Sequence, residues 1–516
     1  MIRELIRRGG NFSATRTGGR FFINVLGRQL LDSAAIMRDS LRNIGETFDL
    51  KNKKLEVPDD FYINIRYYWP TIGRDYLRAD CESLFEAILR LREGFAKLGG
   101  ALKATVAATA MDLFRRKYLD REYITEPWYS STESAARWSY AGGRVEVFNR
   151  IMKGGFHADI NSCFPYAMLS PVPMELIRTY KSSAIIPEYG IIKAVVDIPR
   201  EEWIPPLFYK APQGKLLFPT GSWNAWLTSL EAKALVERYG SNAVKVEEVH
   251  EYDAQPIFKG YVTDLYARRM KARADGDNVT AETCKLGLNS LYGKLATTRE
   301  REKIVVGPEY AGFPYDNPKE LARIEHMREM RLDANVTVYS EEDHIYGIPQ
   351  FVEFAPYIFP AAASWITANA RVTQLQPLLD MSGESLNYCD TDGFYSQADS
   401  SVYKQHFGKE LGKLKLVDHI KQGEFTAPKT YFYETMEGKE KGAAKGLPRK
   451  SLQAVKDYLT GEAVRVVRML GVFESLVRRD EIAPHSEIQW KQVKTVDQKR
   501  HPSGRPWTIE ETEKLL

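Results

Sequence analysis

The sequence predicts an α/β fold built from two or more subdomains, and three short segments and the chain length support this prediction. Asp159-Ile-Asn-Ser-Cys-Phe-Pro165 and Tyr388-Cys-Asp-Thr-Asp-Gly393 each end an expected strand with carboxylates. Lys285-Leu-Gly-Leu-Asn-Ser-Leu-Tyr-Gly-Lys294 lies between them on an expected helix. A chain of 516 residues is too long for one compact core.

The composition is that of an ordinary globular protein, with 44% hydrophobic and 27% charged residues. No apolar run approaches the roughly 18 residues that would cross a bilayer, so no membrane is expected as a partner. The net charge is only +4, so nucleic-acid binding would rest on a local basic surface. The cysteines form no CxxC pair and predict free thiols in a reducing compartment: Cys81, Cys163, Cys284 and Cys389.

The N-terminus is rich in arginine and contains one acid, Glu4, before residue 28. Such a segment can be an organellar transit peptide. We favour a basic folded segment, because the following residues continue as domain sequence, and therefore expect a cytoplasmic location, with an organellar one as the alternative. The arginines are Arg3, Arg7, Arg8, Arg16, Arg20 and Arg28.

Residues 1 to about 125 are expected to mix helices with a few strands. A strand is predicted over residues 21–26 and an amphipathic helix over 80–97. Tyr140-Ala-Gly-Gly143 introduces a turn that suits a junction between lobes. Strands are predicted over residues 144–148 and 156–160, and the second of these carries Asp159.

The rest of the chain is expected to alternate between insertions and core elements. A turn composition at 274–278 predicts a helical hairpin with turns of helix on either side. Residues 297–350 are highly charged and are expected to form an exposed excursion. The other expected elements are proline-punctuated strands within 170–256, a helix near 229–239, the hairpin over about 260–296, a helix over 361–379, and a helix near 452–470.

The carboxylate segments suit phosphoryl transfer, which requires positioning and charge neutralisation more than covalent chemistry. Two divalent ions about 3.5–4 Å apart can activate a hydroxyl and stabilise a departing pyrophosphate. Mg²⁺ commonly takes one or two carboxylates together with substrate phosphates. Asp390 and Asp392 are two residues apart and project to the same side of an extended strand. The alternative for Asp392 taken alone is a solvated Asp-Gly turn.

The helical segment carries a polar and aromatic stripe beside an apolar one. Lys285, Asn289 and Tyr292 lie at i, i+4 and i+7. A lysine there offers a point charge to phosphate, and a tyrosine can lie against a base or sugar. The alternative is an amphipathic helix with a solvated lysine. Additional positive charge is expected from the partner helix: Arg269, Lys271 and Arg273.

In this order, the three segments resemble motifs A, B and C of family B DNA polymerases. Their spacing, the Tyr140-Ala-Gly-Gly143 junction and Lys429-Thr-Tyr431 resemble the protein-primed branch found in small phages, adenoviruses and linear plasmids. The resemblance covers nearly the whole chain.

The resemblance implies a metal site and a nucleotide site. Asp159 and Asp392 would be the main metal ligands, assisted by the Ile160 carbonyl, and Asp390 would be a supporting carboxylate. The cofactor would be two Mg²⁺ ions, with Mn²⁺ able to substitute. Phe164 would be the steric gate under the sugar.

The resemblance also implies substrate contacts outside the metal site. Lys285 would hold the triphosphate, with Asn289 and Tyr292 lining the nascent base pair. DNA would be contacted by residues of the junction, of the Lys429 segment and of the basic thumb. These residues are Tyr140, Gly142, Gly143, Lys429, Tyr431 and Lys445.

The fold implied is a right-hand polymerase with an antiparallel palm sheet, helical fingers and a small thumb, preceded by a partial ribonuclease-H-like exonuclease domain. The insertions would resemble the family's two terminal-protein regions, the first contacting a priming protein and the second encircling downstream DNA. The expected domains are a partial exonuclease (1–125), a linker and first part of the palm (126–169), a first insertion (170–256), fingers (257–296), a second insertion (297–355), palm (356–435) and thumb (436–516).

Two departures from the family pattern stand out. Gly393 replaces the serine that is usual in motif C and is expected to loosen that turn. Tyr76-Leu-Arg-Ala-Asp80 matches the last exonuclease motif, but no Asp-x-Glu precedes it, and Asp32 and Asp39 do not supply one. One aspartate cannot hold two metals, so we expect no proofreading.

The leading hypothesis is a template-directed DNA polymerase of the protein-primed type. Its expected partners are template and primer DNA, dNTPs and a terminal priming protein, and the chain is expected to be a monomer. Two alternatives stay open: a catalytically idle nucleic-acid-binding relic, and a family B polymerase that uses ordinary nucleic-acid primers. An active nuclease is a third, which the missing Asp-x-Glu argues against.

Overall fold

The structure is a computed structural model. It describes residues 12–17, 20–25, 28–37, 39–58, 60–61, 64–120, 131–181, 185–211, 214–306, 318–329, 335–340, 345–352, 357–379, 385–445, 447, 452–469, 486–491 and 499–515. Arg3, Arg7 and Arg8 of the basic N-terminus lie outside these ranges.

The chain folds into two compact units, each assembled from three separate stretches of sequence. Unit 1 comprises Met1–Thr125, Asp264–Ile358 and Val467–Ile488. Unit 2 comprises Glu126–Thr263, Phe359–Val466 and Gln489–Leu516. The domain boundaries expected from the sequence stay predictions, since each unit combines parts of several of them.

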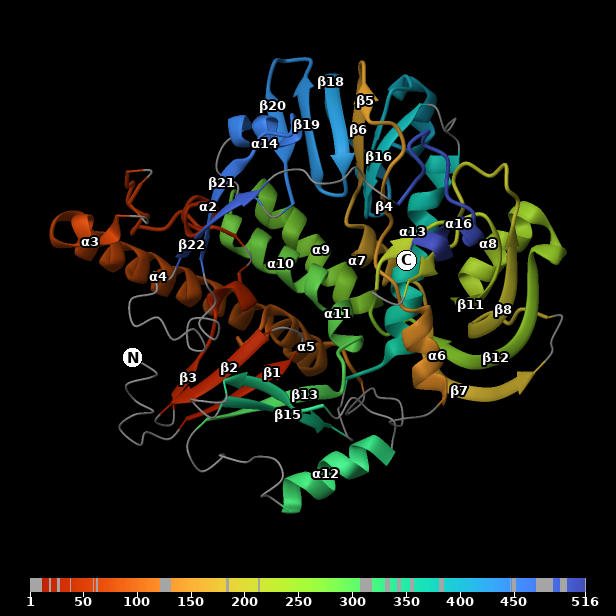
Figure 1. Cartoon of the computed structure of the whole chain (residues 1–516), viewed down its shortest axis with the longest axis horizontal. Helices are drawn as coiled ribbons and strands as arrows, with labels where there is room; N and C mark the ends of the chain where they lie inside the picture. The colour runs from red at the N-terminus through yellow and green to blue at the C-terminus, as the bar shows by residue number, and fades with distance from the viewer. Residues whose placement is uncertain are drawn as a thin grey trace. The chain divides into compact units, whose positions relative to one another are not determined.

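Unit 2 is built around an antiparallel sheet with strand order β20-β19-β18-β6-β17-β16-β4, and β5 pairs with β18 beside this path (Figure 1). Strand β6 shows how the sheet is organised: Phe156, Ala158 and Ile160 are buried, and the alternate positions His157 and Asp159 are less so. The strands are β4 Val145–Val147, β5 Ile151–Met152, β6 Gly155–Ile160, β16 Leu386–Asp390, β17 Gly393–Ser396, β18 Leu414–Ala427, β19 Thr430–Thr435 and β20 Glu440–Ala443.

Helix α13 (Pro360–Leu379) is the interior helix of unit 2. Its buried residues lie on every side, which suits a helix surrounded by protein. It packs against α7 (Cys163–Ala167), α6 (Ser131–Ser139) and β7 (Val172–Lys181). It therefore links the strand-end segment after Asp159 to the elements on either side.

The first insertion of unit 2 is a second antiparallel sheet, in the order β11-β8-β12-β7. Helix α8 (Ser229–Tyr239) covers its apolar core and begins with a capping box in which Thr228 and Glu231 bond each other's backbone. The C-terminal helix α16 (Ile509–Leu515) packs against β11. The remaining elements here are β8 Gly190–Ile198, β9 Tyr209–Lys210, β10 Leu216–Leu217, β11 Gly221–Thr228, η3 Ser241–Ala243 and β12 Val244–Gln255.

Unit 1 contains a six-stranded sheet in which the N-terminal strands pair with the second insertion. The order is β14-β15-β13-β1-β2-β3, and Figure 1 labels five of these strands, all but β14. The pairing of β1 with β13 places Ala14 opposite Ile304. The strands are β1 Phe12–Thr17, β2 Arg20–Val25, β3 Arg28–Leu30, β13 Glu300–Val306, β14 Thr337–Ser340 and β15 Ile345–Phe351.

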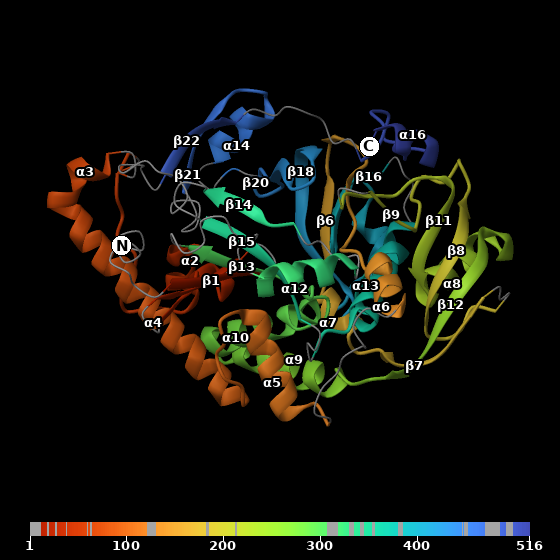
Figure 2. The ribbon, with the colours of Figure 1, turned by 60° about the horizontal axis from the view of Figure 1, so that its bottom comes forward.

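The helices of unit 1 centre on α4 (Arg74–Leu98), which packs against α10 (Asn278–Ser290) and α5 (Val106–Lys117) (Figure 2). At the α4 crossing a Cβ on Gly94 would lie 2.5 Å from the Thr283 hydroxyl, so only glycine permits this approach. The other helices are η1 Ser33–Ala35, α2 Leu41–Thr47, α3 Ile65–Tyr68, η2 Trp69–Gly73, α9 Lys259–Ala274, α11 Tyr292–Leu295 and α12 Pro318–Glu329.

Most elements expected from the sequence are confirmed, and two expectations are wrong. The charged stretch 297–350 is not a mere exposed excursion, because it supplies β13 and β15, whose Ile304, Val305 and Ile348 are buried. Other elements, outside both sheets of unit 2, are η5 Ser400–His406, α14 Leu452–Leu459, β21 Val464–Met469 and β22 Ser486–Lys491.

The second wrong expectation is the helix near 452–470. Helix α14 ends at Leu459, and Gly461 then adopts a left-handed φ of 88°. Val464, Val466 and Val467 follow in strand β21, where β-branched side chains are favoured.

Among the helices that the structure describes, none is long and apolar enough to cross a membrane.

Candidate functional site

The hairpin β16–β17 brings Asp390 and Asp392 to one end of the unit 2 sheet. Thr391 occupies the left-handed position of the turn (φ 64°), and its backbone N–H donates to the Arg144 carbonyl at 2.7 Å. A Cβ on Gly143 would lie 2.7 Å from the Thr391 side chain. Glycine at this position therefore allows the junction segment to pass directly beside the carboxylate turn.

Asp159 lies beside this turn because β6 and β17 are neighbouring strands. Gly393 pairs with Asp159 in the register, and the Ile160 N–H donates to the Asp392 carbonyl at 2.8 Å. The sequence required these strands to be neighbours for the two motifs to form one site. The structure confirms this pairing.

The carboxylates of Asp159 and Asp392 are not fully neutralised by the side chains around them. Burial, followed by the charges of Asp159 and Asp390, raises the pKa of Asp392 to about 7. Burial also raises the pKa of Asp159, which the ammonium of Lys415, 4.0 Å away, partly offsets. Carboxylates held together in this way favour either a proton or a cation.

Asp390 differs from its neighbours because a cation already neutralises it. Its two oxygens lie 2.8 and 2.9 Å from Nζ of Lys429, and the Tyr388 hydroxyl donates to it at 3.0 Å. The Tyr388 oxygen in turn accepts the Lys429 backbone N–H at 2.9 Å. Asp390 is thus tied to the β18–β19 turn, whereas Asp392 is close enough to Asp159 for the charge of Asp159 to raise its pKa.

This donor set fits a small, hard divalent cation. Mg²⁺ takes one or two carboxylates and completes its octahedron with water and phosphate oxygens. Across the described ranges no group of three or more His, Cys, Asp or Glu side chains is arranged as a metal cage. Two unneutralised carboxylates without a cage suit a metal that substrate helps to hold.

The turn that follows Asp159 is braced by a segment that the sequence did not reveal. The Asn161 side chain donates to the Gly408 carbonyl at 2.9 Å, and its backbone N–H donates to the Lys413 carbonyl at 2.9 Å. Phe164 follows in α7 after Ser162, which has a left-handed φ of 51°. Phe164 is therefore the second residue of a short helix, and the two hydrogen bonds of Asn161 hold the turn that precedes this helix.

The junction Tyr140-Ala-Gly-Gly143 is held by a buried arginine that the sequence analysis missed. Arg371 of α13 donates to the Ala141 and Gly142 carbonyls and pairs with Glu231 of α8. Lys210 donates to the Tyr140 carbonyl at 3.3 Å. The available signal was Arg371 itself, the one charged residue in the sequence of α13.

Tyr431 and Lys445 lie in the β18–β20 part of unit 2. The Tyr431 ring packs among the aromatic side chains of Tyr388, Tyr395 and Phe425, with ring centroids 5.6 to 5.7 Å away. Lys445 is exposed, and its backbone N–H donates to the Thr430 hydroxyl at 3.2 Å.

The predicted nucleotide-binding residues of the helical hairpin belong to unit 1. Lys285 on α10 is half-exposed, and its ammonium lies 3.0 Å from both oxygens of Glu282. Asn289 is exposed on α10, and Tyr292 begins the separate helix α11. The stripe expected from helical periodicity is therefore divided between two helical segments.

The basic residues on α9 differ in their surroundings. Burial, and then the nearby Arg273, lower the pKa of Arg269, which is half-buried. Lys271 and Arg273 are exposed. Positive charge is therefore concentrated along one stretch of this helix.

The exonuclease-like motif of unit 1 is a satisfied ion pair. Asp80 accepts from Nζ of Lys54 at 2.8 and 3.0 Å, and Tyr76 is buried against Phe61 with ring centroids 4.9 Å apart. Asp32 and Asp39 instead make local bonds at helix starts, to the Ala34 and Ser40 N–H groups. These three aspartates do not form a second carboxylate cluster.

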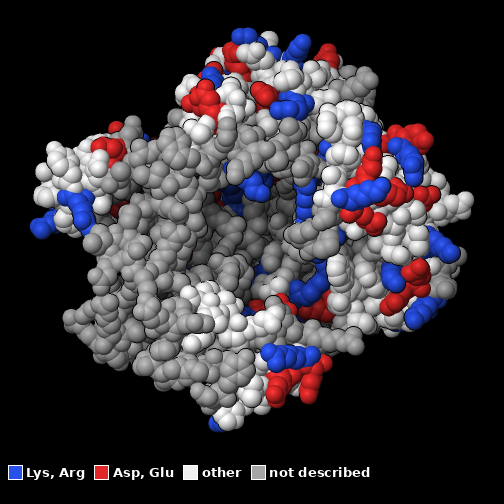
Figure 3. All heavy atoms as spheres, viewed as in Figure 1, with Lys and Arg blue, Asp and Glu red and all other residues white. Residues whose placement is uncertain are grey.

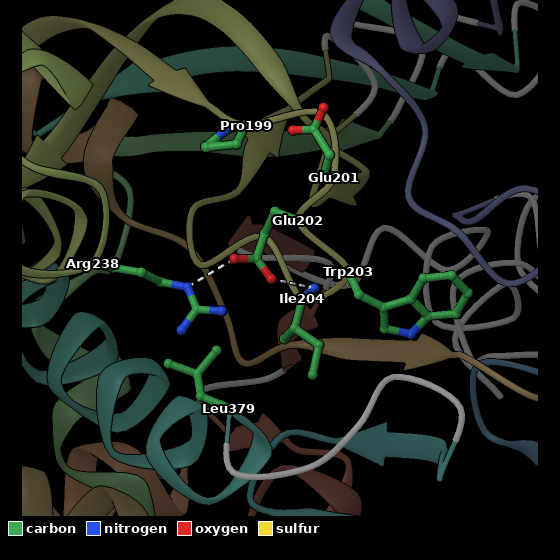
Figure 4. Close-up of a pocket in the computed structure, with 7 residues that line it drawn as sticks. All are labelled: Pro199, Glu201, Glu202, Trp203, Ile204, Arg238 and Leu379. Carbon is green, nitrogen blue, oxygen red and sulfur yellow. Dashed lines mark hydrogen bonds and ion pairs between the residues drawn. The ribbon is translucent and has the colours of Figure 1, made fainter.

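A pocket of about 400 Å³ lies apart from the carboxylates, lined by the 199–204 loop, Arg238 and Leu379 (Figure 4). Arg238 and Glu202 pair at 2.7 Å, and Glu202 also accepts the Ile204 N–H. The two charges neutralise each other. On the face drawn in Figure 3, acidic and basic side chains are interspersed over the β8, β11 and β12 region, without one continuous basic patch.

The comparison with known families decides the classification of the chain. Residues 70–324 match the family described as DNA polymerase type B, organellar and viral. The match spans 255 of the 516 residues of the chain. The expectation drawn from the three motifs is thus confirmed.

Curated relatives within the type B polymerases include fungal sequences. The chain is 26% identical to a probable DNA polymerase of Podospora anserina over 356 residues, covering 63% of this chain and 28% of the relative. It is 25% identical to one of Agaricus bitorquis over 399 residues, covering 70% and 48%. The chain spans about half the length, or less, of these relatives.

Solved structures support the polymerase fold. Phi29 DNA polymerase complexed with single-stranded DNA matches with a TM-score of 0.64 at 16% identity, covering 89% of this chain and 81% of that one. Its ternary complex with primer-template DNA and incoming nucleotides gives 0.63 at 16% identity, covering 87% and 79%. The predicted right-hand α/β fold is confirmed, whereas a partial exonuclease domain stays a prediction.

Proposed function

We propose that this chain is a template-directed DNA polymerase whose chemistry takes place at Asp159 and Asp392. The observation that carries the proposal is the pairing of β6 with β17, which places two unneutralised carboxylates side by side at a sheet end. The family match and the fold support it. In this reaction a primer 3′ hydroxyl attacks the α-phosphate of a dNTP, forming one phosphodiester bond and releasing pyrophosphate.

We assign Asp159, Asp392 and the Ile160 carbonyl to two Mg²⁺ ions, for which Mn²⁺ could substitute. Such ions, when bound, lower the pKa of the attacking hydroxyl and neutralise the departing phosphates. The carboxylates hold them at fixed positions. Asp390 acts at a distance, by fixing Lys429.

The paired Lys429 would present its ammonium at the primer end. It is held by Asp390 on one side and by the Tyr388 hydroxyl through its backbone. Tyr431 would lie beside it at the primer, Lys445 would contact duplex phosphates, and Tyr140 with Gly142 and Gly143 would guide the template. The bonds from Arg371 to the junction carbonyls support a fixed path there.

On the fingers, we assign Lys285 to the triphosphate and Asn289 and Tyr292 to the nascent base pair. Glu282 supports this role, because it holds the Lys285 ammonium in place until phosphates, with greater charge, take over. Arg269, Lys271 and Arg273 would add positive charge. Phe164 would close the floor under the sugar and exclude a 2′-hydroxyl.

We further propose priming by a protein hydroxyl and an absence of proofreading. The β7–β12 insertion, assigned to residues 170–256, would contact the priming protein, and 297–355 would contact downstream DNA. The Asp80–Lys54 pair supports the absence of proofreading, because Lys54 already neutralises the one retained exonuclease carboxylate. A polymerase using ordinary nucleic-acid primers is the second candidate, and the Phi29 complexes with primer-template DNA favour testing it.

The test is primer extension on a primed template with dNTPs and Mg²⁺, comparing the wild-type chain with Asp159→Ala and Asp392→Ala. Both variants are expected to lose synthesis. Asp399→Ala is the matched control, because Asp399 only caps the 3₁₀ helix η5 through the Ser401 N–H. Synthesis retained by the Asp159 and Asp392 variants would refute the proposal, and salt-sensitive DNA binding without synthesis by the wild type would favour an idle relic. Labelling of a candidate priming protein, in place of a DNA primer, separates the two modes of priming.

A further inference from the structure

Gly393, the residue that departs from the usual motif C, lies in a crowded position on β17. Its backbone does not require glycine, since Gly393 is absent from the positive-φ residues and Thr391 supplies the left-handed turn. A Cβ at position 393 would instead lie 3.3 Å from each of three atoms: the Ala158 carbonyl oxygen, Oδ1 of Asp159 and Nε2 of His157. The expectation that this glycine loosens the turn stays a prediction, and the structure adds that a larger residue here would be crowded.

The Cβ position of residue 393 therefore borders both Asp159, a proposed metal ligand, and His157. His157 lies two residues before Asp159 on β6, so both side chains project to the same face of the sheet. In the register Gly393 pairs with Asp159 and Tyr395 pairs with His157. The four residues form a two-by-two block on neighbouring strands.

The imidazole of His157 is fixed from several directions. Its ring stacks on that of Tyr395, with centroids 4.1 Å apart and 6° between the planes. Nδ1 lies 3.8 Å from a carboxylate oxygen of Asp418, which itself accepts from the Tyr433 hydroxyl at 2.7 Å and from Lys441 at 2.8 Å. The His157 side chain is only 17% exposed. Moving the imidazole away from an added atom at position 393 would disturb its stacking on Tyr395.

We propose that the glycine at 393 is matched to His157 and thereby preserves the orientation of the Asp159 carboxylate. His157, held by Tyr395, occupies the space next to Gly393, and the missing side chain at 393 leaves Asp159 free to adopt its orientation. Any side chain at 393 would have to displace either the fixed imidazole or the carboxylate, and the carboxylate has the fewer restraints. Gly393 is thus matched to His157: with the imidazole in place, only glycine at 393 spares the Asp159 carboxylate a displacement.

This inference rests on the proposed function, because it assumes that Asp159 is a metal ligand. Mg²⁺ requires near-ideal octahedral geometry at about 2.0–2.1 Å, so a displacement of a few tenths of an ångström at a ligand weakens binding. Residues that orient a ligand typically contribute about 10–100-fold to metal affinity. The expected effect is therefore on metal affinity more than on folding.

The experiment measures Mn²⁺ binding to the full chain by electron paramagnetic resonance, with melting in chelator as a measure of folding. We expect Gly393→Ala to weaken Mn²⁺ binding by about tenfold with little change of melting temperature. The double variant His157→Ala/Gly393→Ala should recover to within about threefold of wild type, because the smaller residue at 157 accepts the methyl group. His157→Ser repeats the rescue if the first double variant melts early in chelator. Gly45→Ala on helix α2 is the matched control, since no atom lies within 4 Å of its Cβ position and the residue has no assigned role.

Unchanged Mn²⁺ binding in Gly393→Ala would overturn the inference, as would a double variant that binds no better than the single one. Asp159→Ala separates this failure from failure of the proposed function. If Asp159→Ala keeps Mn²⁺ binding, the assigned metal site is wrong. If it loses binding while Gly393→Ala does not, only the matching of Gly393 to His157 is wrong.

Discussion

The carboxylates at the β16–β17 hairpin and the carboxylate of Asp80 on α4 have opposite electrostatic settings. Asp159 and Asp392 lie close together with raised pKa values, whereas Asp80 lies within 3.0 Å of the Lys54 ammonium. The first arrangement stores repulsion that a cation relieves, and the second has already been neutralised by the chain itself. An aspartate in a motif therefore indicates a metal site only when its charge is left unpaired.

Of the predicted substitutions, Asp392→Asn should have the largest effect on DNA synthesis. Removing one of the two unneutralised carboxylates is expected to reduce the rate of primer extension on the order of 10³-fold or more, since a ligand contributing several kcal/mol to the transition state is lost. The rate is measured by single-turnover extension with Mg²⁺. A loss of less than tenfold would show that Asp392 does not hold the metal.

Phe164→Val should change sugar selectivity next most strongly. A smaller side chain would leave room for a 2′-hydroxyl, so the preference for dNTP over NTP should fall by about 10–100-fold, as for other changes of packing in a pocket. The ratio of kcat/KM for dCTP and CTP measures this preference. Tyr166→Val, on the same short helix, is the control, and an unchanged ratio in the Phe164 variant would count against the gate.

Lys429→Met should have an intermediate effect. Losing the ammonium leaves Asp390 without its cation and the primer without a contact, so the KM for primer should rise by about tenfold. Steady-state extension at varied primer concentration measures it. Lys421→Met is the matched control, because Lys421 forms a lysine–carboxylate pair with Glu434 on the same sheet. Equal effects of the two substitutions would contradict a specific role for Lys429.

The pH dependence of stability tests whether burial and the charges of Asp159 and Asp390 disfavour the ionised Asp392 carboxylate. With a folded-state pKa of about 7 against about 3.9 in the unfolded chain, folded Asp392 keeps a proton that the unfolded chain has lost. Stability should therefore fall as pH rises from about 4 through 7. Asp392→Asn should lose this fall, and Mg²⁺ should reverse it in the wild type at pH 8. The melting temperatures of wild type and Asp392→Asn are compared in chelator across this pH range. Their difference isolates the contribution of Asp392 from that of other titrating groups. A difference that does not grow with pH would contradict the raised pKa of Asp392.

Asp80→Asn should have the smallest effect. The Lys54–Asp80 pair is partly exposed, so its loss is expected to cost about 1 kcal/mol or less. Degradation of a labelled single-stranded 3′ end should be negligible in both forms. Degradation by the wild type that disappears in the variant would restore a nuclease role for this motif.

Local sequence signals predicted the parts of the molecule that depend on neighbouring residues. The helix near 229–239, the hairpin turn at 274–278 and the carboxylate hairpin each depend on residues that are close together in the sequence. That Asp159 and Asp392 lie close together was expected on the condition that their strands are neighbours, and the pairing of β6 with β17 meets that condition.

Features that depend on distant partners could not be predicted in this way. Periodicity sets which face of a strand is buried but not which strand it pairs with, so the pairing of β1 with β13 was missed. The contacts of Arg371 with the junction and of His157 with Gly393 likewise join separate elements. The expected helix at 452–470 is longer than α14, which ends at Leu459. Gly461 is a local signal that a helix ends, because glycine readily adopts the left-handed conformation found there.

The six-stranded sheet of unit 1 has a consequence for how the protein is made. Strand β1 pairs with β13, which follows it by about 290 residues. The N-terminal ribbon formed by β1, β2 and β3 therefore leaves the ribosome long before β13 is synthesised. Contacts this distant in sequence slow folding and leave strand edges open to aggregation in the meantime. A shortened chain that begins after the N-terminal ribbon would likewise expose the edge of β13, so expression of the full chain with chaperone support is expected to give the more soluble protein.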